Sequence, residues 1–371
     1  MNILFAIGSR ANLGSSRSVI ERLRSEHNVS ALAYATAVLP RYGDVATELA
    51  TICETERVYC HVEGENREST SLTASLVQSQ VGAALARRKP DLVFCIGDRY
   101  EVVPVAYAAH LLGIPIAHTM AGEISGTIDD ANRDAITRLS TWHFCATEKA
   151  ASRVRDVLGG PGRVFVTGCP RIDIAACCAL SIHGHVVKRD VSLGKHEWAA
   201  TVTKPYVVIS FHPDVHQADQ AGDQMRAVLD GVMAAWDGDV HLFWPNSDPG
   251  AADIVRVVRE RMGGRIKTHR NMRDEDYYSL LAGARCCVGN SSSFLREGSF
   301  LGCPVVMVGA RQDGREHTSN VEQWVHPFGG DSVGIAAAVR DTLAAPRPGS
   351  SALYGDGRAA ERIAECLKCA S

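Results

Sequence analysis

The stretch from residue 91 to residue 148 constrains the fold more than any other part of this chain. Two apolar runs in it, Leu92–Ile96 and Ile114–His118, are short and bounded by turn residues, which is typical of strands buried in a parallel sheet. A helix-like segment separates the runs, and a charged loop, a second helix-like segment and another strand-like run follow. The sequence therefore predicts successive strand–helix–strand units with polar loops at the carboxyl ends of the strands.

Charged residues cluster directly after these predicted strands. They are Asp98, Arg99, Glu123, Asp129, Asp130 and Arg133. Because the carboxyl ends of parallel strands meet at one edge of a sheet, we expect these side chains to lie close together, where α/β proteins bind ligands. A solvated rim would also carry charges, but ionisable groups at consecutive strand ends favour a functional site.

The same alternation of strands and helices runs through the whole chain and is interrupted once. Further strand-like runs are Asn2–Ile7, Val29–Tyr34, Val164–Thr167, Tyr206–Phe211, Val240–Trp244, Arg285–Val288 and Pro304–Val308. Residues 179–205 lack apolar periodicity and are rich in His and Lys. We therefore predict two Rossmann-like, doubly wound α/β domains at residues 1–178 and 206–351, joined by a linker at 179–205. Residues 352–371 have the pattern of a terminal amphipathic helix.

Polar groups also follow the predicted strands of the second domain. His212 and Asn246 come after two of them, and the serine-rich turn Ser291–Ser293 opens a predicted helix, with Arg311 after the next strand. Backbone N–H groups at a helix start and a nearby guanidinium suit a diphosphate, although simple helix capping would also explain the serines alone. The turn Ser9–Ser16 is similar. These features predict one ligand in a cleft between the domains, with its anionic group on the second domain.

Composition and charge exclude several functions. The chain has 371 residues with 39 basic and 42 acidic side chains, which argues against a nucleic-acid partner. No apolar run approaches the ~20 residues that a membrane span needs. The first residues resemble a strand and not a secretion signal, and Cys95, Cys145, Cys286 and Cys287 lie in strand-like runs. We expect a cytoplasmic protein with reduced thiols and without a metal site.

Twelve motifs, in this order, resemble those of the UDP-N-acetylglucosamine 2-epimerase family, and in particular its hydrolysing branch. They are Gly97-Asp98-Arg99, Ala121–Asp130, Arg133, Ala135–Ser140, His143-Phe144, Gly168–Pro170, Phe211–Pro213, Trp244–Asn246, Gly289–Ser293, Arg296-Glu297, Arg311-Gln312 and Gly314–Glu316. The resemblance covers nearly the whole chain. It implies the GT-B architecture, in which two Rossmann-like domains face each other across a cleft and a terminal helix returns to the first domain. It also implies a homodimer.

The resemblance further implies a reaction and the residues that perform it. The family eliminates UDP across C1–C2 of the sugar and then hydrates the product with inversion at C2, without a metal or redox cofactor. The positions that match its catalytic residues are Asp98, Glu123, Asp129, Asp130 and Arg133. Those that match its binding of the nucleotide sugar are Arg10, Asn12, Arg99, His212, Asn246, Ser291, Ser292, Glu297 and Arg311.

Four positions of the first domain depart from the family pattern. Met120 stands where the hydrolysing branch has a glutamate, Asn12 replaces an acidic residue, and Val38 and Asp134 replace histidines. Methionine cannot transfer a proton, so Glu123 or Asp134 would have to replace the missing acid or base.

Three functions therefore remain open. The first is a hydrolysing epimerase that acts on UDP-N-acetylglucosamine or a modified UDP-sugar. The second is a divergent enzyme that hydrolyses or transfers a nucleotide sugar without inversion at C2. The third is a nucleotide-sugar binding protein without catalytic activity, which would not need the acidic cluster after residue 97.

Overall fold

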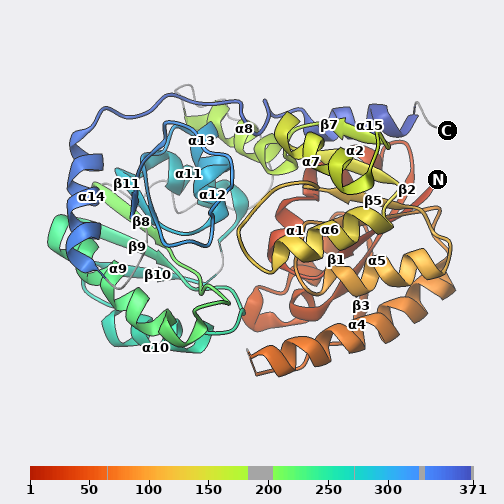
Figure 1. Ribbon diagram of the computed structural model, residues 1–371, viewed down its shortest axis with the longest axis horizontal. Coiled ribbons are helices and arrows are strands. Elements are labelled where there is room, and N and C mark those ends of the chain that lie inside the picture. Colours follow the sequence, from red (N-terminus) through yellow and green to blue (C-terminus); the bar gives the residue numbers. More distant parts are fainter. Residues whose placement is uncertain (65, 183–203, 271, 326–330, 369–371) are drawn as a thin grey trace. The chain divides into compact units, whose positions relative to one another are not determined.

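The chain forms two compact units. The computed structural model describes residues 1–64, 66–182, 204–270, 272–325 and 331–368 (Figure 1). One unit comprises Met1–Asp173 and Tyr354–Ser371, and the other comprises Ile174–Leu353. Most of the linker predicted at 179–205 lies outside the described residues. Among the helices that the structure describes, none is long and apolar enough to cross a membrane.

The first unit is built on a sheet of seven parallel strands. They are β1 (Asn2–Ile7), β2 (Asn28–Tyr34), β3 (Glu54–Val58), β4 (Leu92–Ile96), β5 (Ile116–Thr119), β6 (Trp142–Cys145) and β7 (Val164–Val166). Their spatial order is β3-β2-β1-β4-β5-β6-β7. The helices are α1 (Arg10–Gly14), α2 (Arg17–Leu23), α3 (Val45–Ala50), α4 (Arg67–Arg88), α5 (Val102–Leu111), α6 (Asp129–Leu139), α7 (Glu148–Leu158) and α15 (Ala359–Lys368), and α8 (Pro170–Ile182) leads into the second unit.

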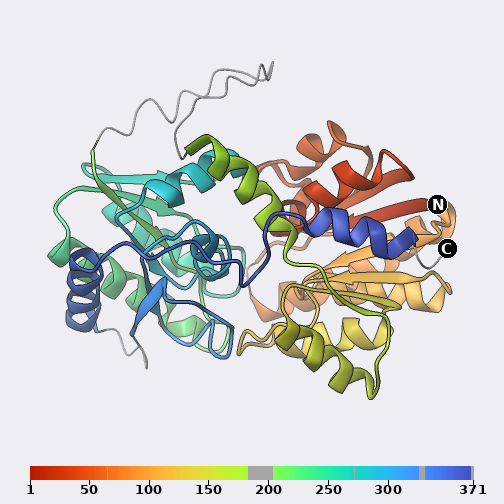
Figure 2. The same cartoon turned by 90° about the horizontal axis from the view of Figure 1, so that it is seen from above.

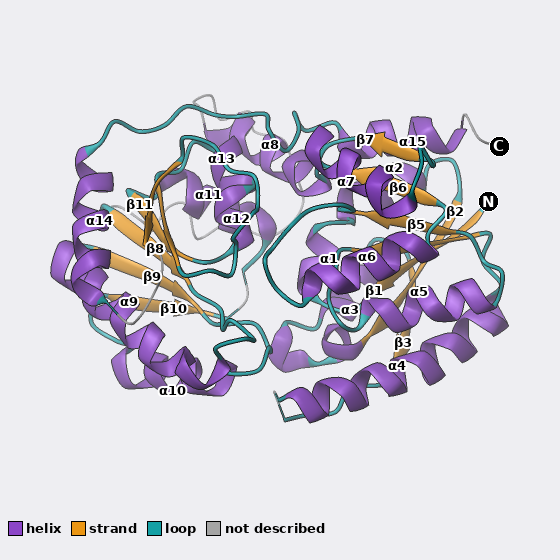
Figure 3. Cartoon of the chain, viewed as in Figure 1, coloured by secondary structure: helices purple, strands orange, loops and turns teal. Residues whose placement is uncertain are grey.

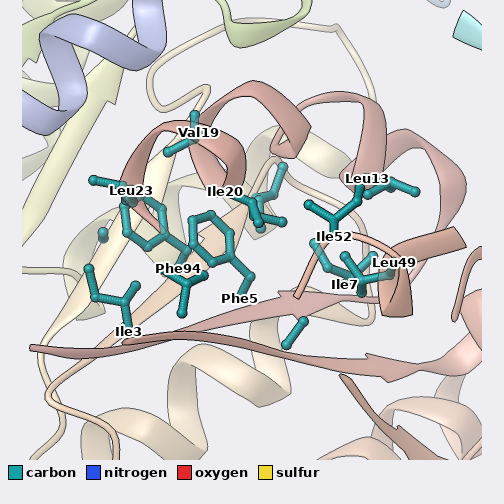
Figure 4. Close-up of a cluster of buried hydrophobic side chains, with 14 of the residues drawn as sticks. Ile3, Phe5, Ile7, Leu13, Val19, Ile20, Leu23, Leu49, Ile52 and Phe94 are labelled. Atoms are coloured by element: carbon teal, nitrogen blue, oxygen red, sulfur yellow. The ribbon is translucent and has the colours of Figure 1, made fainter. Parts of the chain in front are cut away.

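Helices cover both faces of this sheet, so its central strands are buried on each side (Figure 3). Ile3, Phe5 and Ile7 face a core cluster completed by α1, α2, α3 and α15, which Figure 4 shows in part. Within it, the rings of Phe5 and Phe94 stack with their centroids 4.4 Å apart. Leu4 points to the opposite cluster, which α4, α5 and α6 complete. The uninterrupted apolar runs of β1 and β4 follow from this double burial.

The terminal helix α15 belongs to the first unit. It packs beside α2, and in Figure 2 the blue C-terminal helix accordingly lies next to the red N-terminal segments. Ile363 and Leu367 are buried in the same core cluster as β1. The carboxylate of Asp173 accepts hydrogen bonds of 2.8 Å from the backbone N–H groups of Ala359 and Ala360, which caps the helix.

The second unit repeats this architecture with six parallel strands. They are β8 (Tyr206–Ser210), β9 (Asp239–Phe243), β10 (Ile266–His269), β11 (Cys286–Gly289), β12 (Val305–Val308) and β13 (Val321–Val325), in the order β10-β9-β8-β11-β12-β13. The helices are α9 (Ala221–Ala235), α10 (Ala251–Arg261), α11 (Asp274–Gly283), α12 (Ser292–Leu295), α13 (Glu297–Phe300) and α14 (Ser332–Ala344). The predicted pair of doubly wound α/β domains is confirmed.

Strand order reverses once in each sheet, and the reversal fixes where ligands can bind. In the first unit it lies between β1 and β4, and in the second between β8 and β11. The helices that follow two such strands lie on opposite faces, which leaves a crevice at the carboxyl ends of the strands. Ligands are therefore expected at the turns after β1 and β4 and at those after β8 and β11.

Three strands were not predicted from the sequence, and all three lie at the edges of the sheets. They are β3, β10 and β13. The segment that forms β3, Glu54–Val58, is mostly charged and partly exposed, and β10 and β13 also carry exposed polar residues. An edge strand pairs on one side only and has one face or more in water, so it lacks the continuous apolar run that identified the central strands.

The cysteines that were assigned to strands are buried thiols. Cys95, Cys145, Cys286 and Cys287 are free and buried in the two sheets. Burial raises the pKa of the first three thiols to about 12. These groups therefore stay protonated at neutral pH, and their role is packing and not nucleophilic chemistry.

Candidate active site

Two tight turns position the acidic residues of the first unit. Gly97, after β4, has φ +76° and is followed at once by Asp98. Gly122, after β5, also has φ +76°, and a Cβ atom there would lie 2.0 Å from the carbonyl oxygen of Ala150. Only glycine permits this backbone approach, which brings the following residue, Glu123, to the edge of the sheet in a buried position.

The guanidinium of Arg133 connects the loops after β4 and β5. Arg133 lies on α6 and is only 1% exposed. It donates hydrogen bonds to the carboxylates of Asp98 and Asp130 and to the backbone carbonyl of Glu123. A buried cation requires such partners, so these contacts also fix the loops that supply them. The structure thus brings together four of the five predicted catalytic residues, and Asp129 is half-buried at the start of α6.

The contacts of Asp130 give this residue a structural role. Its carboxylate also accepts hydrogen bonds from the backbone N–H of Ser125 at 2.8 Å, the hydroxyl of Ser125 at 2.9 Å and the N–H of Gly126 at 2.8 Å. With Arg133, both carboxylate oxygens are engaged in holding the loop. Asp98, Glu123 and Asp129 are therefore better candidates than Asp130 for proton transfer.

Asn12 joins the two strands at the reversal point of the first sheet. Its Oδ1 atom accepts a hydrogen bond of 3.0 Å from the backbone N–H of Gly8, after β1. Its Nδ2 atom donates to the carbonyl of Ile96, at the end of β4, also at 3.0 Å. A carboxylate could not make the second bond because it has no proton to donate. The departure from an acidic residue at this position therefore has a structural reason, while the predicted contact of Asn12 with a ligand stays a prediction.

Two predicted ligand-binding arginines lie at the same edge and are held by acidic residues. Arg10 forms an ion pair of 3.0 Å with Glu48 and donates to the carbonyl of Gly43. Arg99 donates from Nε to the buried carboxylate of Glu101 at 2.8 Å. The positions of both guanidinium groups are thus defined before any ligand binds.

A buried histidine supports the turn that carries Asp98. His118, in β5, is fully buried, and its Nε2 lies 2.8 Å from the carbonyl oxygen of Gly97. Burial lowers the pKa of His118 to about 3, so the ring is neutral. A carbonyl only accepts, so Nε2 carries the proton, and Nδ1 accepts the hydrogen bond from the hydroxyl of Thr137 on α6. This network connects β4, β5 and α6 beneath the acidic cluster.

The other departures from the family pattern are also integrated into the fold. Val38 is buried in the core cluster of β1, and Met120 packs against that cluster with φ +60°, a conformation that non-glycine residues rarely adopt. Asp134 pairs with Arg153 at 2.8 Å, and Arg153 also donates to the carbonyl of Glu123. Asp134 therefore supports the loop that carries Glu123, a role that does not require proton transfer.

Asparagine joins the central strands of the second unit as well. The side chain of Asn290, after β11, accepts from the backbone N–H of His212 at 2.7 Å and donates to its carbonyl at 2.8 Å. The Nδ1 atom of His212 accepts a hydrogen bond of 3.1 Å from the backbone N–H of Asn246. Because a backbone N–H can only donate, the proton of this imidazole lies on Nε2, which is 3.4 Å from the hydroxyl of Ser210.

The remaining predicted nucleotide-binding residues lie at the same edge of the second sheet. Arg311 donates to the carbonyl of Asn290 at 3.3 Å, which places its guanidinium close to the serine-rich turn. Ser291 precedes α12, Ser292 is its first residue, and Glu297 is fully buried at the start of α13. The predicted helix breaks here into two pieces of four residues each. Hydroxyl groups, and not a long helix dipole, are therefore the main donors of this turn.

Sequence reasoning overlooked three buried polar residues that position these groups. They are Glu101, His118 and Asn290, each at least nine-tenths buried and each bonded to a backbone or side chain at a strand end. The sequence offered one indication of such residues, namely a polar residue within a segment that is otherwise apolar. Gly97 and His212, the partners of His118 and Asn290, lie far away in the sequence, so spacing alone could not identify them. Arg99 lies only two residues before Glu101, but nothing in the sequence pattern showed that Glu101 is buried.

The role of Asn12 predicts that a change toward the family pattern is harmful. In Asn12→Asp, a carboxylate oxygen would face the carbonyl of Ile96, leaving that buried acceptor without its donor. We expect a loss of about 2 kcal/mol in the free energy of unfolding, measured by urea denaturation. Asn28→Asp, at an exposed position on β2, is the matched control. Equal stabilities of the two variants would contradict the role assigned to Asn12.

Comparison with known proteins identifies the family. The family model for UDP-N-acetylglucosamine 2-epimerase matches residues 21–368. A hydrolysing UDP-N,N'-diacetylbacillosamine 2-epimerase from Legionella pneumophila is 28% identical over 99% of this chain and 95% of its own length. A UDP-N-acetylglucosamine 2-epimerase from Neisseria meningitidis serogroup B is 25% identical over 84% of this chain and 81% of its own.

Solved structures agree with this assignment at the level of the fold. The UDP-N-acetylglucosamine 2-epimerase of Methanocaldococcus jannaschii, in complex with UDP-GlcNAc and UDP, has a TM-score of 0.81 at 17% identity, with both chains fully covered. The enzyme of Neisseria meningitidis, bound to UDP-GlcNAc, has a TM-score of 0.76 at 17% identity, again with full coverage. The GT-B class predicted from the sequence is thereby confirmed. This chain belongs to the UDP-N-acetylglucosamine 2-epimerase family.

Proposed function

We propose that this protein is a hydrolysing 2-epimerase of a UDP-linked N-acetylamino sugar, either UDP-N-acetylglucosamine or a modified form of it. The observation that carries the proposal is the acidic cluster around Arg133, at the reversal point of a sheet in a chain of this family. The hydrolysing relative from Legionella pneumophila, which matches almost the full length of the chain, supports this branch of the family. UDP-N,N'-diacetylbacillosamine, for which that relative is named, is a UDP-sugar with two acetylated amino groups.

In this proposal the first unit acts on the sugar. A carboxylate removes the proton from C2 while UDP leaves from C1, which gives an unsaturated sugar. Water then adds its hydroxyl to C1, and a proton returns to C2 on the opposite face. The overall change consumes one water and releases UDP and the C2 epimer. We assign Asp98, Glu123 and Asp129 as the acid and base of this reaction, and each such group typically contributes about 10²–10⁴ in rate.

In the same proposal the second unit binds the uridine diphosphate. Arg311 supplies positive charge, and Ser291, Ser292 and the Nε2–H of His212 supply hydrogen bonds to the phosphates. These donors become more valuable as charge develops on the departing diphosphate. Glu297 would accept hydrogen bonds from the ribose hydroxyls. No metal is required for this chemistry, because the diphosphate is already a good leaving group.

Met120 keeps one alternative open. An apolar side chain stands where the hydrolysing branch has a glutamate, and it packs against the core cluster of β1. An enzyme of this fold that hydrolyses or transfers a nucleotide sugar without inversion at C2 would not need an acid there. This alternative predicts release of UDP with the configuration of the sugar unchanged.

We propose a homodimer in the cytoplasm, and the outer faces of α4 and α5 support the dimer. α4 and α5 pack side by side (Figure 1). α4 has no Asp, Glu, Lys or Arg between Glu68 and Arg87, and α5 has none along its whole length. Their exposed apolar residues are Leu72, Leu76, Tyr107, Leu111 and Leu112, which are 41–63% exposed. An uncharged apolar surface does not repel a second copy of itself, and depletion of charge is typical of interface centres.

A substrate panel tests the proposed reaction. We expect purified protein to release UDP from UDP-N-acetylglucosamine or UDP-N,N'-diacetylbacillosamine and to give the C2 epimer, identified by NMR coupling constants. Asp98→Asn should lower kcat by about 10²-fold or more, whereas Asp156→Asn, on an exposed position of α7, should not. Release of UDP with retention at C2 would favour the alternative enzyme. Binding without turnover across the panel would favour a binding protein.

The importance of position 120 can be tested by introducing the glutamate that the hydrolysing branch has there. If the protein is an epimerase with one acid or base absent, Met120→Glu should raise kcat by about tenfold or more, even though a charge beside the core lowers the melting temperature. Met120→Gln has nearly the same shape and cannot transfer a proton, so it is the matched control. Equal rates of the two variants would show that this position serves other chemistry.

The proposed interface predicts the oligomeric state. Light scattering after gel filtration should give the mass of a dimer for the wild-type protein. Leu72→Glu combined with Leu76→Glu should give a monomer, because two charges per copy would be buried and face each other. Val333→Glu, at an exposed site on α14 of the other unit, should remain dimeric. A monomeric wild-type protein would refute the proposed interface.

A further inference from the structure

Glu101 is a buried carboxylate that the proposed reaction does not use. It lies just before α5 and is 1% exposed. Its Oε1 atom accepts the 2.8 Å hydrogen bond from Nε of Arg99. The side chain also packs closely beneath the end of β1: a Cβ atom on Gly8 would lie 2.8 Å from Cγ of Glu101 and 3.0 Å from the ring of Tyr34.

Packing alone does not explain a carboxylate at this position. The second oxygen, Oε2, and the hydroxyl of Tyr34 are both buried, and neither has a hydrogen-bond partner among the residues that the structure describes. Burial of a charge is costly, and an apolar side chain of the same length would fill the same space. The start of α5 offsets part of this cost through its dipole. The negative charge of Glu101 is explained by Arg99, whose guanidinium it pairs with.

We propose that Glu101 is a positioning residue for Arg99, which it holds at the carboxyl end of β4 so that the guanidinium meets a polar group of the bound nucleotide sugar. This inference rests on the proposed function. Arg99 directly follows Asp98, whose carboxylate Arg133 holds, so two neighbouring groups of one turn are each fixed by an ion pair. Because the charge of Arg99 is balanced by Glu101, the arginine acts through directed N–H groups and not through net charge.

Two substitutions separate positioning from structural support. Glu101→Gln keeps an acceptor for Nε of Arg99, whereas Glu101→Met keeps the length of the side chain and removes the acceptor. We expect kcat/KM for the UDP-sugar to fall in the order wild type, Glu101→Gln, Glu101→Met, with a loss of roughly tenfold to a hundredfold for the last variant. Its melting temperature should fall as well, because the mostly buried guanidinium of Arg99 loses its partner, so kcat/KM is the deciding measurement. A lower melting temperature with unchanged kcat/KM would indicate a structural role and overturn the proposal.

A double-mutant cycle tests whether Glu101 acts through Arg99. In the Arg99→Ala background, Glu101→Gln should change kcat/KM and the Kd of UDP-sugar less than twofold, since the group that it positions is gone. The same fold-loss in both backgrounds would overturn the proposal, and this cycle decides the matter even if Glu101→Met fails to fold. Glu56→Gln on β3, which removes the charge that pairs with Arg87 and Arg88 of α4, is the matched control.

The failure of this inference can be distinguished from failure of the proposed function. If wild-type protein neither binds UDP, measured by calorimetry, nor turns over any UDP-sugar, the function and the inference fall together. If the wild-type protein is an active epimerase and the cycle is additive, only the positioning role of Glu101 is refuted.

Discussion

The buried guanidinium of Arg133 is the interaction on which the candidate site depends. A cation with 1% exposure is tolerated only where carboxylates and carbonyls surround it, and here these partners come from the turns after β4 and β5 and from α6. The requirement of one side chain therefore determines the positions of Asp98 and of the backbone at Glu123. Arg153 and His118 stabilise the same loops from neighbouring elements. These contacts define the positions of the acidic groups without a ligand, and acid–base chemistry depends on such positioning.

The two units solve the same structural problem with the same functional group. At each reversal of strand order, backbone groups at or just beyond the ends of the two central strands bond to a side-chain amide. Asn12 in the first unit and Asn290 in the second each supply one acceptor and one donor to these backbone groups. An amide can do both, whereas a carboxylate cannot. This explains why Asn12 departs from the acidic residue of the family without a loss of structural order.

The sequence was sufficient for the central strands and the fold class, because double burial leaves a local pattern, and strand-end polarity indicated which charged residues would gather after β4 and β5. It was insufficient at the edges, where β3 is mostly charged and has no apolar run. It was also insufficient for the partners within the site. The sequence pattern did not indicate that Asp130 holds the loop at Ser125 and Gly126, although these partners are near in the sequence. Nothing local indicates that Met120 packs against the core of β1 or that Asp134 pairs with Arg153, because these contacts depend on residues that meet only after the chain has folded.

The central claim is that the first unit removes and returns a proton at C2 of a UDP-linked sugar. The most direct measurement is turnover in D₂O followed by proton NMR of the released sugar. The account predicts loss of the C2 proton signal in an epimerised product, since the returning proton comes from solvent, together with one UDP per sugar. A released sugar that keeps its C2 proton and its original configuration would contradict the account, because C1 would then have reacted without elimination.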